Sequence, residues 1–285
     1  MREMKFMPLL FLLLVFFSGC GDSMQKTDIE MENLSGKVRS YQEISYEAIM
    51  LDGAAVKGAR KREFPWSYDR RKEFNESGFI VKDCHLGSSE EKTFCYKNIY
   101  DEKNRKLESI GVDAAGDIKE KTFFQYNEKG EALEHRSFVG DILKEAGKYE
   151  YDSDGNIAAA FFYNASGEME SKEYFQYNEK GFLTEKRILS PENQIENCFI
   201  YKRDKKGNML EMKFFRKDME PGGTYSYQRD KKGNIVEEHF YHSNGTLLNK
   251  TIFRYKYDKQ GNWIEKTVLK EKTATFILER TIEYY

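Results

Sequence analysis

One short turn recurs along this chain and constrains its fold more than any other feature. A clear copy is Tyr257-Asp258-Lys259-Gln260-Gly261-Asn262. The Asp carboxylate can accept hydrogen bonds from the backbone of the turn, and glycine provides the positive φ that ends a type I turn before a second strand. The glycine position recurs at intervals of 25 to 28 residues, with asparagine, the other residue that tolerates this geometry, replacing it once: Gly78, Asn104, Gly130, Gly155, Gly181, Gly207, Gly233 and Gly261.

A second set of turn residues falls about eleven residues after each of these positions. Each repeat is therefore two short strands joined by tight turns, which is the pattern of tandem β-hairpins. Aromatic residues make up 15% of the chain, nearly all of them Tyr and Phe, and these residues favour strands. We predict an all-β fold, an antiparallel meander of about eighteen short strands built from ~26-residue hairpin repeats. A sheet this wide is expected to be strongly coiled or closed.

Tyrosines recur six and four residues before the turn position, so they share one face of the sheet. Two interpretations of this row remain open. The rings could form the structural core, or they could bind a sugar or peptide on a concave surface. Solvent exposure distinguishes the two interpretations. The candidate aromatic binding face consists of Tyr151, Tyr177, Tyr201, Tyr227, Tyr255 and Tyr257.

Residues 1–20 have the pattern of a processed leader. Arg2 and Lys5 precede an apolar run of twelve residues, which is the length of a signal-peptide core and short for a membrane span. The run ends in Phe17-Ser18-Gly19-Cys20, which resembles a bacterial lipobox and implies lipidation of Cys20. The alternative is an ordinary signal peptide that contains a cysteine. We expect a tether at 21–33, an N-terminal capping hairpin at 34–67 and the repeat domain at 68–285.

The turn pattern resembles a known repeat. Tyr151-Asp152-Ser153-Asp154-Gly155-Asn156 and the copy ending at Asn262 are similar to YD repeats, the unit of the RHS-repeat family. Two copies depart from it, with Arg203 and Arg229 in place of tyrosine. Together with the lipobox, the layout resembles the YD-repeat lipoproteins of Bacteroidetes. Large RHS proteins use such repeats as a β-shell around a toxin, but this chain is far shorter, so the resemblance implies only the hairpin unit.

The cysteines and histidines contribute few candidate sites. Cys84 and Cys95 flank a turn, so they could form a cross-strand disulfide or remain two buried thiols, while Cys198 reads as a small buried hydrophobe. His239 and His242 are three residues apart and should point to opposite faces of a strand, which disfavours a shared metal. We predict no metal site, no cofactor and no catalytic residue.

The charge distribution and the motifs of the chain limit the classes of function that we expect. The net charge is −2 and acidic and basic residues are interspersed, so nucleic acid is not an expected partner. Lys and Glu on both sheet faces disfavour an outer-membrane barrel. We expect a non-catalytic protein of the bacterial envelope, lipid-anchored to the outer membrane through Cys20, with a structural role or an envelope protein or glycan as partner. The alternative is an envelope carbohydrate-processing or other hydrolytic enzyme whose site is assembled across strands.

Overall fold

The computed structural model describes residues 26–60, 69–87, 93–271 and 273–285. The predicted leader and Cys20 lie outside these ranges. Within them, no helix has the length and apolar character needed to cross a bilayer. The elements are α1 (Asp28–Met31), β1 (Val38–Leu51), β2 (Ala54–Arg60), β3 (Asp69–Phe74), β4 (Ile80–Leu86), β5 (Phe94–Tyr100), β6 (Lys106–Asp113), β7 (Ile118–Tyr126), β8 (Ala132–Val139), β9 (Ile142–Tyr151), β10 (Ile157–Asn164), β11 (Met169–Tyr177), β12 (Leu183–Leu189), β13 (Ile195–Arg203), β14 (Met209–Phe215), η2 (Lys217–Met219), β15 (Pro221–Arg229), β16 (Ile235–His242), β17 (Leu247–Tyr257), β18 (Trp263–Lys270) and β19 (Thr273–Tyr284).

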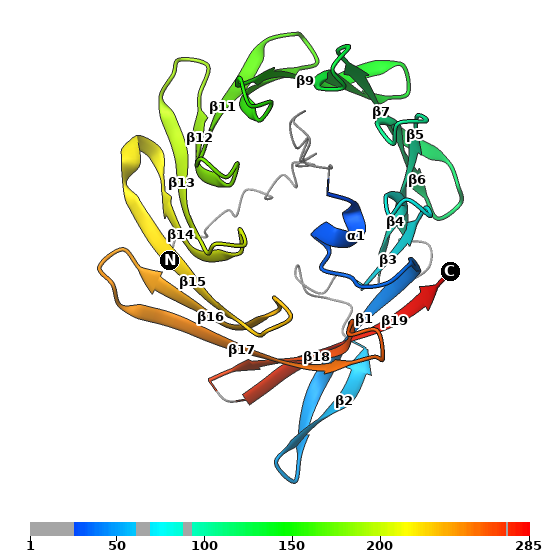
Figure 1. The fold of residues 1–285 in the computed structure, drawn as a ribbon, viewed down its shortest axis with the longest axis vertical. Coiled ribbons are helices and arrows are strands. Elements are labelled where there is room, and N and C mark those ends of the chain that lie inside the picture. Colours follow the sequence, from blue (N-terminus) through cyan, green and yellow to red (C-terminus); the bar gives the residue numbers. More distant parts are fainter. Residues whose placement is uncertain (1–25, 61–68, 88–92, 272) are drawn as a thin grey trace.

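The strands form one antiparallel sheet that closes on itself, so the predicted all-β fold is confirmed. From β3 to β19 each strand pairs with the next in sequence, as in a meander. Strand β1 completes the ring because it pairs with β19 on one side and with β3 on the other. Figure 1 shows the resulting ring of strands end-on.

The sequence predicted that the N-terminal hairpin caps the sheet, but in the structure its first strand is part of the closed ring. Strand β1 is long enough to pair with β3 through Ser40 to Glu43 and with β2 through Tyr46 to Leu51. The first half of β1 therefore closes the barrel, and β2 extends away from it as a separate arm (Figure 1). The closing β1–β19 ladder includes the pairs Tyr41 with Ile282 and Tyr46 with Ile277.

The register of the sheet fixes which side chains face inward. The N-terminal segment contacts Tyr41 and Lys72, and Figure 1 places that segment inside the ring, so these two side chains mark the inner face. Directly opposed residues share a face, so the inner row can be followed from strand to strand. It includes Tyr149 and Ala160 in the middle of the sheet, and their neighbours Lys148 and Phe161 face outward.

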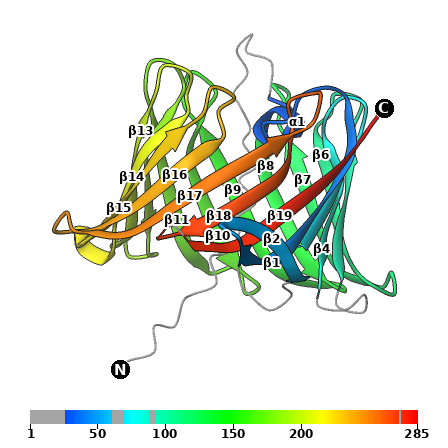
Figure 2. The ribbon, with the colours of Figure 1, turned by 90° about the horizontal axis from the view of Figure 1, so that it is seen from below.

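Residues 26–33 are not the structureless tether that the sequence predicted. Thr27 caps α1 through a capping box with Glu30, and the helix lies at one end of the barrel (Figure 2). The Asp28 carboxylate accepts a hydrogen bond from the backbone of Ile80 at 2.6 Å, and Glu32 pairs with Lys72. This part of the tether prediction is wrong because polar groups of the segment have specific partners on the inner wall and rim.

Candidate functional site

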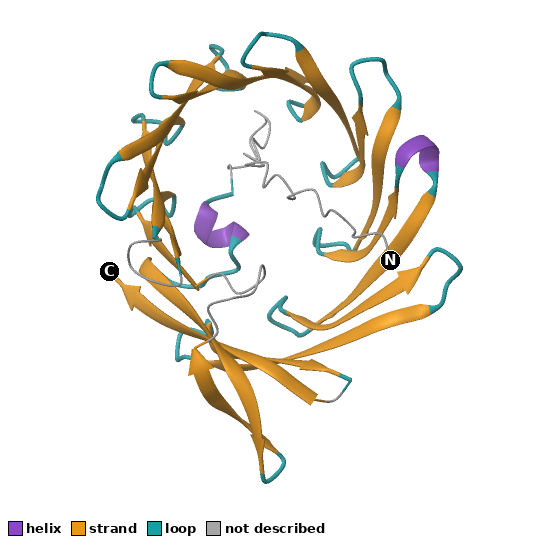
Figure 3. Cartoon of the chain, turned by 180° about the vertical axis from the view of Figure 1, so that it is seen from behind, coloured by secondary structure: helices purple, strands orange, loops and turns teal. Residues whose placement is uncertain are grey.

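The recurring turns are hydrogen-bonded structural units. At Asp258, the carboxylate Oδ1 accepts the N–H groups of Gln260 and Asn262, each at 2.9 Å. The backbone closes the same turn, because Gly261 N–H donates to the carbonyl of Asp258 at 3.2 Å. All eight turn positions have positive φ, including Asn104 at 59°, so the prediction of left-handed geometry there is confirmed. The carboxylates of these turns are occupied in holding the corner of each hairpin, and Figure 3 shows the turns and loops that join the strands.

A ladder of tyrosine hydroxyl groups ties five of the turns to the preceding repeat. Tyr177 donates its hydroxyl to the carbonyl of Ile157 at 3.0 Å, twenty residues earlier. Four other tyrosines make the corresponding bond: Tyr100 to Ile80, Tyr126 to Lys106, Tyr151 to Ala132 and Tyr255 to Ile235. Each bond joins a strand to the strand that precedes it, for example β11 to β10, so it adds a side-chain hydrogen bond to the backbone pairing of neighbours.

The two arginine copies keep this connection. Arg203 Nε donates to the carbonyl of Leu183 at 2.9 Å, and its guanidinium also reaches the carbonyl of Gly207 within its own turn at 2.9 Å. Arg229 makes the same pair of contacts with Met209 and Gly233. Arginine in these two copies therefore makes the same link to the preceding repeat as tyrosine does in the others. The residue type alone did not predict this equivalence.

The candidate aromatic binding face lies on the inner wall, and each of its six tyrosines is half-buried. Burial raises the pKa of Tyr177, Tyr201, Tyr227 and Tyr257 to about 12. Tyr151, Tyr177 and Tyr255 use their hydroxyls in the ladder. Tyr257 bonds instead to Asp230 and Asn234 of the neighbouring turn. The structure therefore brings these residues together along one face and engages four of the six hydroxyls in bonds within the barrel.

Some charged groups on the inner wall are paired, and Arg280 is also packed against rings. The Arg280 guanidinium lies 3.7 Å from the Trp263 ring centroid and 4.4 Å from that of Tyr41, and its Nε donates to Glu43 at 2.9 Å. Farther round the ring, Lys186 contacts Glu173 at 2.9 Å. Burial of Glu173 raises its pKa despite this partner. These pairs are consistent with the rule that buried charges are retained when they are paired.

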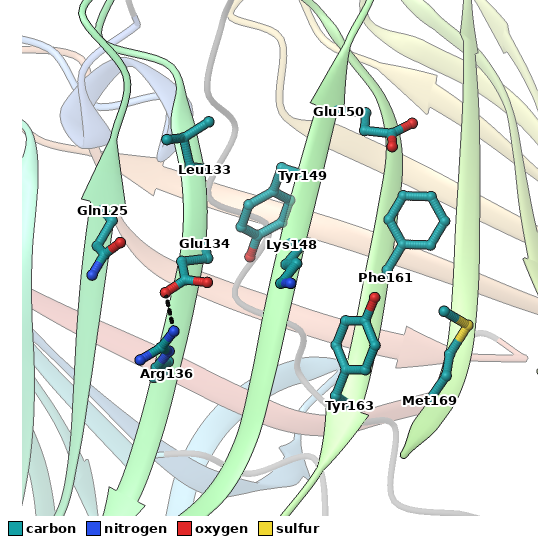
Figure 4. Close-up of a pocket in the computed structure, with 10 residues that line it drawn as sticks. All are labelled: Gln125, Leu133, Glu134, Arg136, Lys148, Tyr149, Glu150, Phe161, Tyr163 and Met169. Atoms are coloured by element: carbon teal, nitrogen blue, oxygen red, sulfur yellow. Dashed lines mark ion pairs between the residues drawn. The ribbon is translucent and has the colours of Figure 1, made fainter. Parts of the chain in front are cut away.

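A shallow groove of about 610 Å³ lies on the outer wall across β7 to β11 (Figure 4). Gln125, Glu134, Lys148 and Phe161 are directly opposed across four strands, in the register that faces outward. Glu134 and Arg136 form an ion pair at 2.9 Å, and Lys148 lies 5.6 Å from the Tyr163 ring centroid. The groove is thus lined by aromatic rings and by charged side chains, of which Glu134 and Arg136 form an ion pair.

The groove coincides with an interruption in the repeat. Four and six residues after the turn position, four of the repeats carry an outward acidic residue and an outward basic residue: Glu134 and Arg136, Glu185 and Arg187, Glu211 and Lys213, and Glu237 and His239. The repeat that begins at Gly155 has Ala159 and Phe161 at these positions. The short side chain of Ala159 stands beside the half-buried ring of Phe161. This groove was not among the sequence-predicted sites, although the absence of the charged pair at Ala159 and Phe161 marks its position.

Aromatic contacts extend this outer surface beyond the groove. Phe161 packs edge-to-face against Tyr174, with ring centroids 6.4 Å apart. Tyr174 also lines a second groove of about 400 Å³, together with Arg187 and Leu189. The Phe161–Tyr174 contact thus places the two grooves next to each other on the outer wall.

The remaining sequence candidates have structural environments. Cys84 and Cys95 face each other in register and their sulfurs are bonded, with Cα atoms 4.0 Å apart, while Cys198 is free and buried. His239 pairs with Ser226 and His242 with Gly223, positions on opposite faces, so the two imidazoles do not converge. In the described ranges, no group of three or more His, Cys, Asp or Glu residues could hold a metal ion.

Comparison with known proteins gives weak structural likenesses. No family model and no curated protein matches the chain. A porin-like protein from Bacteroides uniformis is 9% identical with a TM-score of 0.46, and one from Bacteroides vulgatus is 13% identical with a TM-score of 0.36; each match covers 87% of this chain and 98% of the other. A TcdB2-TccC3-TEV structure is 13% identical, with a TM-score of 0.36 over 74% of this chain and 12% of that chain. At these scores the likenesses carry no argument about function.

Proposed function

We propose that this chain is a lipid-anchored YD-repeat protein of the bacterial outer membrane whose barrel binds an envelope partner and performs no catalysis. The lipobox-like leader supports the anchor, and the repeated turns support the YD-repeat relationship. The turn carboxylates and most of the candidate tyrosine hydroxyls serve the barrel itself. Among the described residues, the outer groove offers a surface for a partner.

The chemistry of the groove favours a neutral glycan. Its charged side chains are Glu134, Glu150, Arg136 and Lys148, so their formal charges cancel. The Glu134–Arg136 pair can donate to and accept from hydroxyl groups without a net field that selects an ion. Phe161 and Tyr163 add apolar ring surface, and such a combination of rings with a few polar groups is typical of small-ligand sites. The groove is the single observation that carries the binding proposal.

Binding can be measured by titrating neutral envelope oligosaccharides into the unlipidated Cys20→Ala chain. Truncation of Phe161 or Tyr163 to alanine should weaken binding about tenfold each, corresponding to ~1–2 kcal/mol for an anchoring aromatic residue. Tyr241→Ala is the matched control, because Tyr241 occupies the same outward repeat position as Tyr163 on another strand. Equal effects of the three variants would contradict a site in the groove.

The same oligosaccharides test the catalytic alternative. We expect the titrated glycans to be recovered intact after prolonged incubation. Release of new reducing ends by the purified chain, lost on replacing Glu134 or Glu150 by glutamine, would show that the groove hydrolyses its ligand and would replace the binding proposal by the enzymatic one.

The anchor is tested separately by fractionation. The Cys20→Ala chain should appear in the soluble envelope fraction, and the parent chain should remain with membranes. A variant that stays membrane-bound in high salt would contradict lipid anchoring through Cys20 without affecting the groove proposal.

A further inference from the structure

Five exposed lysines gather on three neighbouring turns of one barrel rim. They lie in the turns that follow β13, β15 and β17: Lys205, Lys206, Lys231, Lys232 and Lys259, here called the lysine arc. The aspartates of these turns do not neutralise them by ion pairs, because each carboxylate accepts hydrogen bonds inside its own turn. Among the described residues, no lysine of the arc has a carboxylate partner within ion-pair distance.

The other turns of the same rim have a different charge pattern. In three of them a glutamate directly precedes the lysine, giving Glu102-Lys103, Glu128-Lys129 and Glu179-Lys180. Another turn carries Ser153-Asp154 and no cation. Positive charge is therefore concentrated on one part of the rim, although the chain as a whole has a net charge of −2.

The N-terminal segment is fixed to the lysine arc. Asn33 Nδ2 donates to the carbonyl of Lys232 and to Asn234 Oδ1, each at 3.1 Å. The backbone of Ser35 donates to and accepts from the Asn262 amide at 2.7 and 2.8 Å. Figure 2 shows α1, which precedes these contacts, at the same end of the barrel.

The length of chain before this segment limits the distance to the anchor. Lys26, the first described residue, is six positions after Cys20, with five residues between them. A chain of this length spans at most about 20 Å when fully extended, at ~3.3–3.6 Å per residue. A lipid at Cys20 therefore holds this end of the barrel close to the membrane surface.

We propose that the rim bearing the lysine arc faces the membrane and that the arc binds anionic lipid headgroups. The orientation rests on the proposed lipid anchor, while the headgroup contact rests on the lysines alone. Exposed lysines attract an anionic surface within about one Debye length, ~8 Å at physiological salt. The opposite rim and the outer groove then remain accessible to a partner.

Vesicle co-sedimentation of the unlipidated Cys20→Ala chain tests the headgroup contact without the anchor. The chain should bind to phosphatidylcholine vesicles that contain phosphatidylglycerol, and it should bind much less to vesicles of phosphatidylcholine alone. Replacing Lys205, Lys206, Lys231 and Lys259 by glutamine should lower the partition coefficient at least about tenfold. Lys232 is kept because its Nζ lies 3.7 Å from the Tyr257 ring centroid. The control replaces Lys103, Lys129 and Lys180 by glutamine and should bind like the parent chain.

Equal binding of the arc variant and the control variant would overturn the contact, whatever the state of Cys20. Preference of the arc for soluble polyphosphate over anionic vesicles would also overturn it, since the ligand would then be a soluble polyanion. Orientation is read separately on the lipidated chain, with a fluorophore at Lys259→Cys in the arc or at Asn244→Cys, which lies in the turn between β16 and β17 on the opposite rim. Spin-labelled lipids should quench the first probe more strongly, and stronger quenching at Asn244→Cys would reverse the proposed orientation.

Discussion

Loss of one rung of the tyrosine ladder should destabilise the barrel by a measurable amount. Tyr177→Phe keeps the ring and removes only the hydroxyl that donates to the carbonyl of Ile157 at 3.0 Å. A net cost of about 1 kcal/mol is typical for such a bond. For a domain of this size that corresponds to a fall of ~2–4 °C in Tm. Tyr174→Phe is the control, because Tyr174 is 41% exposed on the outer wall and its hydroxyl has no hydrogen bond within the described ranges.

The ladder should also be additive. Tyr126, Tyr151 and Tyr177 lie on alternate strands, about 10 Å apart, where stability effects usually add. The triple replacement by phenylalanine should therefore cost ~3 kcal/mol in the free energy of unfolding, measured by urea denaturation. If Tyr177→Phe were no more costly than Tyr174→Phe, or the triple variant no worse than a single one, the ladder would have no structural role.

Three further predictions address the turns, the inner wall and the disulfide. Gly181→Ala should lower the free energy of unfolding in urea by ~1–2 kcal/mol, because φ at this position is +73°. An added Cβ would lie 3.8 Å from the nearest side-chain atom, so the cost comes from backbone strain and not from a clash. Gly181→Asn should cost less, because Asn104 adopts positive φ at the same turn position. Burial raises the pKa of Tyr201 and Tyr227 to about 12, so their contribution to stability is complete below pH 10 and is lost as the pH rises through 12. In an alkaline titration, the loss of ellipticity that reports unfolding should therefore accompany the rise in tyrosinate absorbance. Ionisation of these tyrosines at lower pH without unfolding would contradict the prediction. Alkylation of the denatured Cys20→Ala chain should find one thiol without reductant and three with it, whereas three in both cases would exclude the disulfide.

The local parts of the fold could be predicted because their chemistry is local. The Asp side chain and the positive φ of the turn position act within five residues, so the spacing of Gly155, Gly181 and their equivalents identified each corner. The tyrosine row was correctly placed on one face, since alternation along a strand depends on parity alone. The sequence did not indicate which face of the sheet lines the inside of the barrel. Aromatic residues occur on both faces, with Phe162 inward and Phe161 outward.

The features of the fold that depend on contacts between distant residues could not be predicted from the repeat pattern. Closure of the ring depends on pairs such as Tyr41 with Ile282, which are far apart in the sequence and share no repeat signature. The helix at Asp28–Met31 was missed, although Thr27 and Glu30 carry the spacing of a capping box. The outer groove was missed because it arises where one repeat has Ala159 and Phe161 in place of the charged pair that four other repeats carry, and the turn pattern does not record this change.

The closed ring is the central claim, because both the groove and the membrane-facing rim depend on its shape. Amide hydrogen exchange of β19 tests it directly. In the closed barrel β19 has a hydrogen-bonded neighbour on each side, β18 and β1, so its amides should be protected as well as those of β11 inside the sheet. Rapid exchange of alternate amides from Phe276 to Ile282, with protection retained in β11, would mean that β19 is an exposed edge and that the barrel does not close.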